Sequence, residues 1–230
     1  MITGLRPDTF KNLQLNAGAF LIGFDYSSIT DADALETAVL EAMEEGTGIL
    51  GATRGGGTFT CTPEVRNIEA DGKRYEFVGS TVFDSRTVTM TGTLLEVNAE
   101  NFARVLSAAD ITTNGQKKTI KIRTDIDTTK DYIKSLVWVG DTSEGMVLIS
   151  LKNALNTTGA NFTFADKGEG TLPFEFHAHQ DSVTDMEYAP CEIVFFDKPA
   201  AQAQKTARRP ESADAEAPGR FSGREAVMKN

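Results

Sequence analysis

The chain of 230 residues has little of several residue types on which common protein classes depend. Two cysteines are too few for a disulfide framework and fit a reducing compartment. The longest apolar runs span about five residues, far short of the ~20 that a membrane helix needs. Residues 1–9 show no basic stretch followed by an apolar one, so we expect no secretory signal and no membrane partner.

Basic residues are also in the minority, and the charge is unevenly distributed. The chain carries 33 acidic and 23 basic side chains, for a net charge of -10. Residues 199–230 hold six of the basic and four of the acidic residues, which leaves -12 on residues 1–198. The segment 199–230 is rich in Ala, Pro and Gln and has too few bulky apolar residues to offset its ordering entropy. We therefore predict one globular domain over 1–198 and a disordered, basic tail over 199–230.

Two helices are predicted within this domain. Thr30 and Asp33 have the spacing of a capping box, apolar residues then follow at helical spacing, and Gly46 ends the run. This pattern predicts an amphipathic helix over about 31–45. Asn98 is the predicted cap of a second helix, in which Phe102 and Val105 share one face.

The rest of the domain has the alternation and turn spacing of strands. Asp71-Gly72 predicts a hairpin turn between strands over 59–68 and 74–82. Further strands are predicted at 12–22, 86–97, 119–124, 132–139, 145–151, 160–164, 171–179 and 191–196. The fold class is therefore mainly β (α+β): a β-sandwich or barrel with a flanking helix and the additional helix over 31–45.

A search for catalytic or metal-binding patterns favours structural explanations. The glycine-rich stretch 51–57 is followed by a predicted strand, and lacks the Gly-Lys-Ser/Thr of a phosphate loop, so a turning loop is favoured. His177 and His179 share one strand face and could chelate a metal, but no third ligand lies at a suitable spacing. Cys61 and Cys191 have the sequence context of small buried residues. We expect no catalytic site, no metal, no cofactor and no enzymatic activity.

Four segments, taken in order, carry a resemblance to a known family. They are Asn12–Leu21, Ile49–Phe59 continuing through Pro63–Gly72, the strand-then-helix step that begins at Val88–Leu95, and Gly168–Asp181. Together they cover about 10–197 and resemble the bacteriophage tail tube proteins, also called major tail proteins.

The resemblance implies a structural subunit that assembles into hexameric rings, which stack into a hollow tube for genome delivery. The implied partners are further copies of this chain, the tape measure, tail terminator and baseplate or tip proteins, and DNA in passage. The implied location is the virion tail, after assembly in the host cytoplasm. Two other classes stay open: the inner tube of a contractile tail, bacteriocin-like particle or type VI secretion system, and a monomeric β-barrel binding module.

Candidate assembly residues follow from this interpretation. The ring-stacking candidates, beside an N-terminal arm over 1–10, are Gly51, Arg54, Gly55, Gly56, Gly57, Asp71 and Gly72. An acidic lumen would repel the DNA phosphates and prevent sticking. The lumen-lining candidates are Glu64, Glu69 and Glu76.

Overall fold

A computed structural model describes residues 13–198 of the chain, except 15, 47, 165 and 184–185. The described residues belong to one unit, Met1–Pro199. The predicted disordered tail over 199–230 and the predicted N-terminal arm over 1–10 lie outside the described residues.

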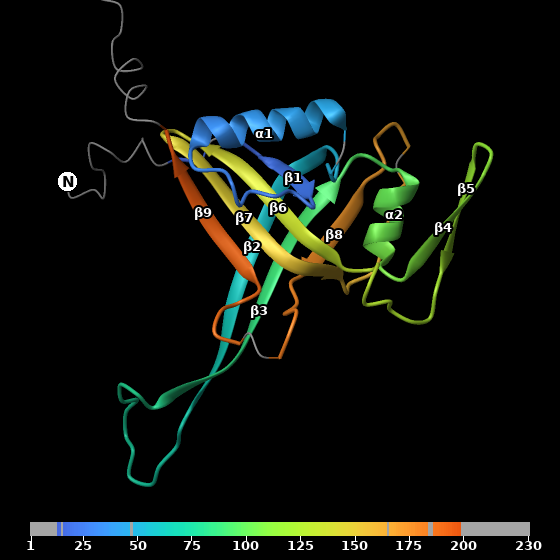
Figure 1. Ribbon diagram of the computed structural model, residues 1–230. Coiled ribbons are helices and arrows are strands. Elements are labelled where there is room, and N and C mark those ends of the chain that lie inside the picture. Colours follow the sequence, from blue (N-terminus) through green and yellow to red (C-terminus); the bar gives the residue numbers. More distant parts are fainter. Residues whose placement is uncertain (1–12, 15, 47, 165, 184–185, 199–230) are drawn as a thin grey trace, which may run out of the picture. The chain divides into compact units, whose positions relative to one another are not determined.

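Seven strands form one antiparallel sheet that folds over into two facing halves (Figure 1). Sheet A has the order β1-β6-β7-β9 and consists of β1 (Ala19–Ile22), β6 (Ile133–Thr142), β7 (Gly145–Asn156) and β9 (Cys191–Asp197). Sheet B has the order β2-β3-β8 and consists of β2 (Thr53–Asn67), β3 (Thr81–Leu94) and β8 (Leu172–His177). The end of β7 pairs with β8, with Leu155 opposite His177, and so joins the two sheets.

Alternation along the strands explains why the sheets pack as a sandwich. In β3 the even-numbered Val88 and Met90 point into the core between the sheets, where they meet Phe20 and Leu136 of sheet A. The rings of Phe20 and Phe174 make an edge-on contact across this core, with their centroids 5.4 Å apart. The predicted fold class, mainly β with a sandwich and a flanking helix, is confirmed.

Helix α1 (Ala32–Glu45) covers the other face of sheet A (Figure 1). Its apolar side, with Leu35 and Val39, forms a second core against Leu21 and Leu148. The predicted helix over 31–45 is therefore confirmed and ends at Gly46, which has φ +63°. The predicted cap was wrong by one residue: Asp31, not Thr30, is the N-cap, because its carboxylate accepts the Ala34 N–H at 2.9 Å.

Helix α2 (Ala99–Leu106) has Asn98 as its N-cap, as predicted, and places Val105 in the core between the sheets. A separate hairpin follows it, formed by β4 (Ala109–Asn114) and β5 (Lys117–Ile122). We predicted β5 approximately, as 119–124, but no strand at β4. Gly115-Gln116 joins the two strands, and Gly115 has φ +63°, as a two-residue turn with glycine at its first position requires.

Four predicted strands differ from the structure. The expected strand over 12–22 is limited to the four residues of β1, with an isolated bridge from Gln14 to Thr142. The segment 160–164 forms only an isolated bridge, at Thr163. The strands predicted over 74–82 and 86–97 are replaced by one strand, β3, because pairing with β2 continues across 83–85, with an irregularity between Glu64 and Val65. Residues 74–80 lie in the loop before it.

Candidate assembly surfaces

Strands β2 and β3 extend beyond the sandwich as a two-stranded arm that ends in the loop 68–80 (Figure 1). We call the segment from Val65 to Phe83 the arm. The predicted turn at Asp71-Gly72 is present, with the Lys73 N–H donating to the Ala70 carbonyl at 3.0 Å, but it lies within a longer loop and does not join the two strands directly. Gly72 has φ +83°, which this turn accommodates without strain.

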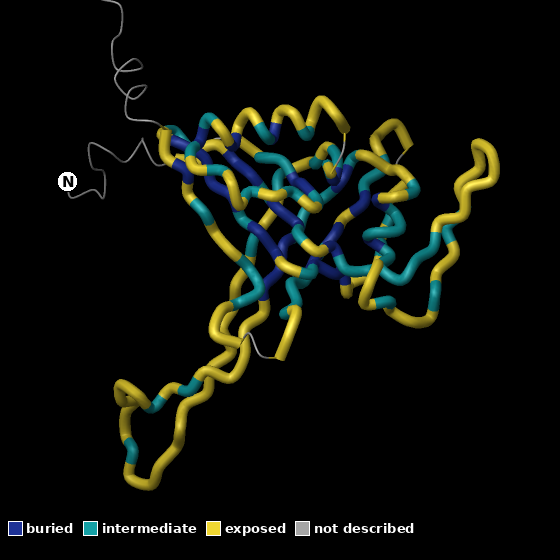
Figure 2. Tube along the Cα trace, in the orientation of Figure 1, coloured by how far each residue is buried: buried dark blue, intermediate teal, exposed yellow. Residues whose placement is uncertain are grey.

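The arm is exposed along almost its whole length (Figure 2), and several of its exposed residues are large and apolar. Tyr75 and Phe77 are 78% and 62% exposed, and Val78 is fully exposed. The other exposed apolar residues of the arm are Val65, Ile68 and Phe83. Contiguous apolar exposure of this kind marks interaction surfaces in soluble proteins.

The glycine-rich segment 51–57 is a strand with a bulge over most of its length, so the predicted turning loop was wrong. Thr53 pairs with Leu94 and Gly57 pairs with Gly92, which leaves three residues of β2 opposite the single Thr93. Gly55 and Gly56 occupy this bulge with φ +76° and +74°, values that favour glycine. The glycines of this segment therefore allow the backbone to form the bulge and to pack closely.

Gly57 and Gly92 allow aromatic rings to pack directly on the backbone of sheet B. A Cβ at Gly57 would lie 2.6 Å from the tip of the Phe20 ring, and a Cβ at Gly92 would lie 2.6 Å from the tip of the Phe174 ring. Both rings are buried. These glycines therefore fix the position of sheet B against the core.

The outer face of sheet B is polar and rich in threonine, since its side chains alternate with those of the core. We call this surface the threonine face. It consists of Thr58, Thr60, Thr62 and Glu64 of β2, Ser85, Thr87, Thr89, Thr91 and Thr93 of β3, and Pro173, Glu175 and His177 of β8. These side chains include two carboxylates and no lysine or arginine, and all except Thr89 are exposed or half-buried.

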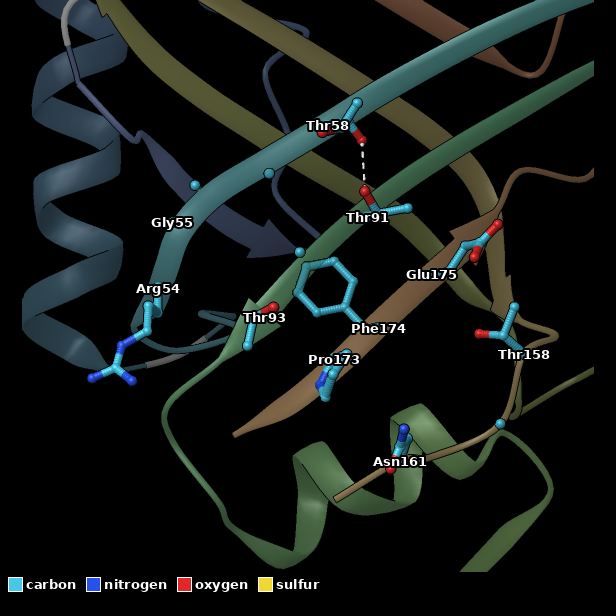
Figure 3. Close-up of a pocket in the computed structure, with 14 residues that line it drawn as sticks. Arg54, Gly55, Thr58, Thr91, Thr93, Thr158, Asn161, Pro173, Phe174 and Glu175 are labelled. Atoms are coloured by element: carbon cyan, nitrogen blue, oxygen red, sulfur yellow. Dashed lines mark hydrogen bonds between the residues drawn. The ribbon is translucent and has the colours of Figure 1, made fainter. Parts of the chain in front are cut away.

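A groove of about 540 Å³ crosses the end of the threonine face near the bulge (Figure 3). Strands β2, β3 and β8 form its floor, and Thr158 and Asn161 flank it from the segment after β7. Arg54 stands at one end, where its guanidinium lies 2.6 Å from the Glu169 carboxylate. Arg54 holds the pKa of that carboxyl below its usual value.

The three predicted lumen acids lie on different parts of the β2–β3 hairpin. Glu64 belongs to the threonine face and accepts a hydrogen bond from the Ser85 hydroxyl at 2.7 Å. Glu69 and Glu76 lie in the arm loop instead, where Glu76 accepts from the Asn67 side-chain amide at 2.6 Å. The threonine face also carries Glu175, which the sequence did not lead us to single out. The alternation along Leu172–His177 directs its side chain away from the core.

Two long strand edges are free in the described residues. Strand β2 pairs only with β3, and β9 pairs only with β7. The edge of β1 is covered, because the Leu50 N–H donates to the Phe20 carbonyl at 3.0 Å and Ile49 forms a β-bridge with Leu21. Each free edge presents unpaired backbone donors and acceptors to another chain.

The two histidines have protein partners. His177 Nε2 lies 3.2 Å from the Glu175 carboxylate, and the His179 ring nitrogen Nδ1 lies 3.2 Å from the Asn153 carbonyl oxygen. The described residues contain no group of three or more side chains placed to hold a metal ion. Of the two helices in the described part, neither has the length and apolar content to cross a membrane.

Comparison with known proteins gives similarity to solved structures only. No family model matches the chain, and no curated protein matches it. Among solved structures, a chain in "Virion of native gene transfer agent (GTA) particle" is similar at 11% identity and a TM-score of 0.33. The similarity covers 63% of this chain and 85% of that one. At this level it carries no argument about function.

Proposed function

We propose that this chain is the structural subunit of a viral tail tube, in which rings of identical subunits stack into a hollow conduit for genome delivery. The hexameric ring follows from the sequence resemblance, as do the tape measure, terminator and baseplate or tip proteins as partners. The proposal places the subunit in the virion tail, after assembly in the host cytoplasm, and gives it no chemistry of its own.

The observation that carries the proposal is the pair of free edges on β2 and β9. Edges of this length promote open-ended aggregation unless another chain covers them. Edge-to-edge pairing between identical subunits in a closed ring satisfies the backbone groups and stops at a finite number of copies. Stacking of rings is the second contact that a tube needs, and the exposed apolar arm suits it.

Sedimentation velocity over a range of concentrations tests assembly directly. We expect rings or longer polymers to form with rising concentration. A single species near 24.9 kDa at every concentration would instead favour the monomeric binding module.

Proline substitution on β9 tests whether its edge is the contact. In an edge strand, the N–H groups of successive residues point alternately to the neighbouring strand and outward. Of Ile193→Pro and Val194→Pro, one removes a bond to β7 and the other removes an outward donor. We expect the variant with the outward substitution to fold and stay monomeric. Ring formation by that folded variant would exclude this edge.

The threonine face has the chemistry expected of a lumen wall. Hydroxyls and carboxylates without ammonium or guanidinium groups form few attractive contacts with DNA phosphates. We expect Glu64→Lys with Glu175→Lys to leave tubes intact and slow DNA ejection. Glu41→Lys, on the exposed side of α1, is the matched control and leaves ejection unchanged. Normal ejection through tubes of the double variant would show that this face does not line the lumen.

The inner tube of a contractile tail or secretion system has the same assembly chemistry and differs in having a sheath around it. Binding of a sheath protein to purified tubes would favour that alternative. Tubes that bind no sheath protein support the non-contractile tail.

A further inference from the structure

The only two cysteines of the chain meet across the sandwich. Cys61 lies in β2 opposite Val88, and Cys191 begins β9 opposite Leu151, so the two belong to different sheets. Cys61 has the same strand parity as Phe59, which packs on the core between the sheets, and Cys191 packs against that core as well. Backbone hydrogen bonds join the surroundings of the two residues: the Ala178 N–H donates to the carbonyl of Val88, which is opposite Cys61, and the Lys152 N–H donates to the carbonyl of Pro190, which precedes Cys191. The His179 N–H donates to the Lys152 carbonyl and so connects these two places. Fold topology therefore brings together two thiols that are far apart in the sequence.

The two thiols differ in access to small molecules. Cys61 is exposed, whereas Cys191 is half-buried. Burial raises the pKa of the Cys191 thiol, and Cys61 adds to this effect, while Arg86 and Lys152 act in the opposite direction. The exposed Cys61 is therefore the sulfur that a small disulfide reaches first.

We propose that Cys61 and Cys191 form an intramolecular disulfide by exchange with a low-molecular-weight disulfide such as oxidised glutathione. The Cys61 thiolate attacks one sulfur of the small disulfide, forms a mixed disulfide and releases one small thiolate. The Cys191 thiolate then attacks the Cys61 sulfur, forms the protein disulfide and expels the second small thiolate. Two protein thiols are oxidised to one disulfide, and one small disulfide is reduced to two thiols.

The disulfide closes a side of the sandwich that no strand pairing holds within the described part of the chain. Sheets A and B are joined through the β7–β8 pairing, whereas β2 and β9 are the free edges of their sheets. A bond from Cys61 to Cys191 links these two edge strands covalently. The biological setting of this disulfide rests on the proposed function. We assign the disulfide to the released particle, because the thiols stay reduced during assembly in the cytoplasm and oxidise outside the cell.

The experiment compares the full chain in reduced and oxidised glutathione. In oxidised glutathione we expect the two free thiols to fall to zero and the intact mass to fall by two hydrogen atoms. Digestion without reductant then yields one linked peptide pair that contains Cys61 and Cys191. We also expect Tm to rise by about 4–16 °C, from the usual stabilisation by a disulfide and the usual Tm response of a domain this size.

Cys61→Ser and Cys191→Ser are the matched controls. Each variant retains one thiol, so neither loses two hydrogens and neither gains Tm on oxidation. Two persistent free thiols, two glutathione adducts per chain, or disulfide-linked dimers of the natural chain would each overturn the inference.

The outcome is separable from that of the proposed function, because mass and thiol count do not depend on assembly. Tubes that never form the disulfide would overturn this inference alone. A permanently monomeric chain that forms it would overturn the tail tube alone.

Discussion

Replacing Phe77 and Val78 of the arm by serine separates assembly from folding. Both side chains are exposed in the single subunit, with Phe77 at 62% and Val78 fully exposed, so folding gains almost nothing from them. Full burial of such side chains against a neighbouring ring stabilises by about 1.5–3 kcal/mol each. The double substitution thus removes about 3–6 kcal/mol per subunit from ring stacking. Since 1.4 kcal/mol corresponds to a tenfold change, stacking weakens by at least about 100-fold.

Thermal unfolding and sedimentation measure the two effects side by side. We expect the Phe77→Ser, Val78→Ser variant to keep the natural Tm and to sediment as rings that no longer form tubes. Ile122→Ser is the matched control, because this exposed apolar residue lies on the separate β4–β5 hairpin. Tubes of unchanged stability from the double variant, or a large loss of Tm, would refute the assignment of the arm to stacking.

Three further predictions concern the stability of the subunit. Gly92→Ala places a methyl group against the buried Phe174 ring. We expect it to lower the free energy of unfolding by about 1–3 kcal/mol in a denaturant titration. An unchanged midpoint would contradict this packing. Asn156→Ala removes the buried hydrogen bond, 2.7 Å long, from the Asn156 side-chain amide to the Val105 carbonyl. We expect the free energy of unfolding to fall by about 1–3 kcal/mol in the same assay. An unchanged free energy of unfolding would show that this bond does not stabilise the subunit. Burial, followed by the hydrogen bond to Glu192, raises the pKa of Tyr26, so its stabilisation is present below the unfolded pKa of about 10 and is lost as pH rises further. The free energy of unfolding should therefore fall more steeply above pH 10 in the natural chain than in Tyr26→Phe, and equal slopes would contradict the assignment.

Periodicity in the sequence was sufficient to predict the fold class and both helices. The apolar residues of α1 recur at helical spacing over fourteen residues, and Gly46 and Asn98 mark helix ends by their own backbone chemistry. In β3, alternation of apolar residues with threonines identified the buried side. Such local patterns reflect burial on one face, so they persist without knowledge of the partner sheet.

Pairing between distant segments could not be predicted in the same way. Gly55 and Gly56 have the composition of a turn, and only the pairing of β2 with β3 shows that they form a bulge. The threonine face likewise exists because β2, β3 and β8 are neighbours, and this order does not follow the sequence. The hairpin at Gly115 was predictable in principle, because glycine at the first position of a two-residue turn is a known signal.

Negative-stain electron microscopy of the purified full chain tests the central claim most directly. The tail tube proposal predicts rings with a central hole, seen end-on, and stacks of such rings with a constant diameter, seen from the side. Uniform particles of single-subunit size at concentrations that permit assembly would contradict it.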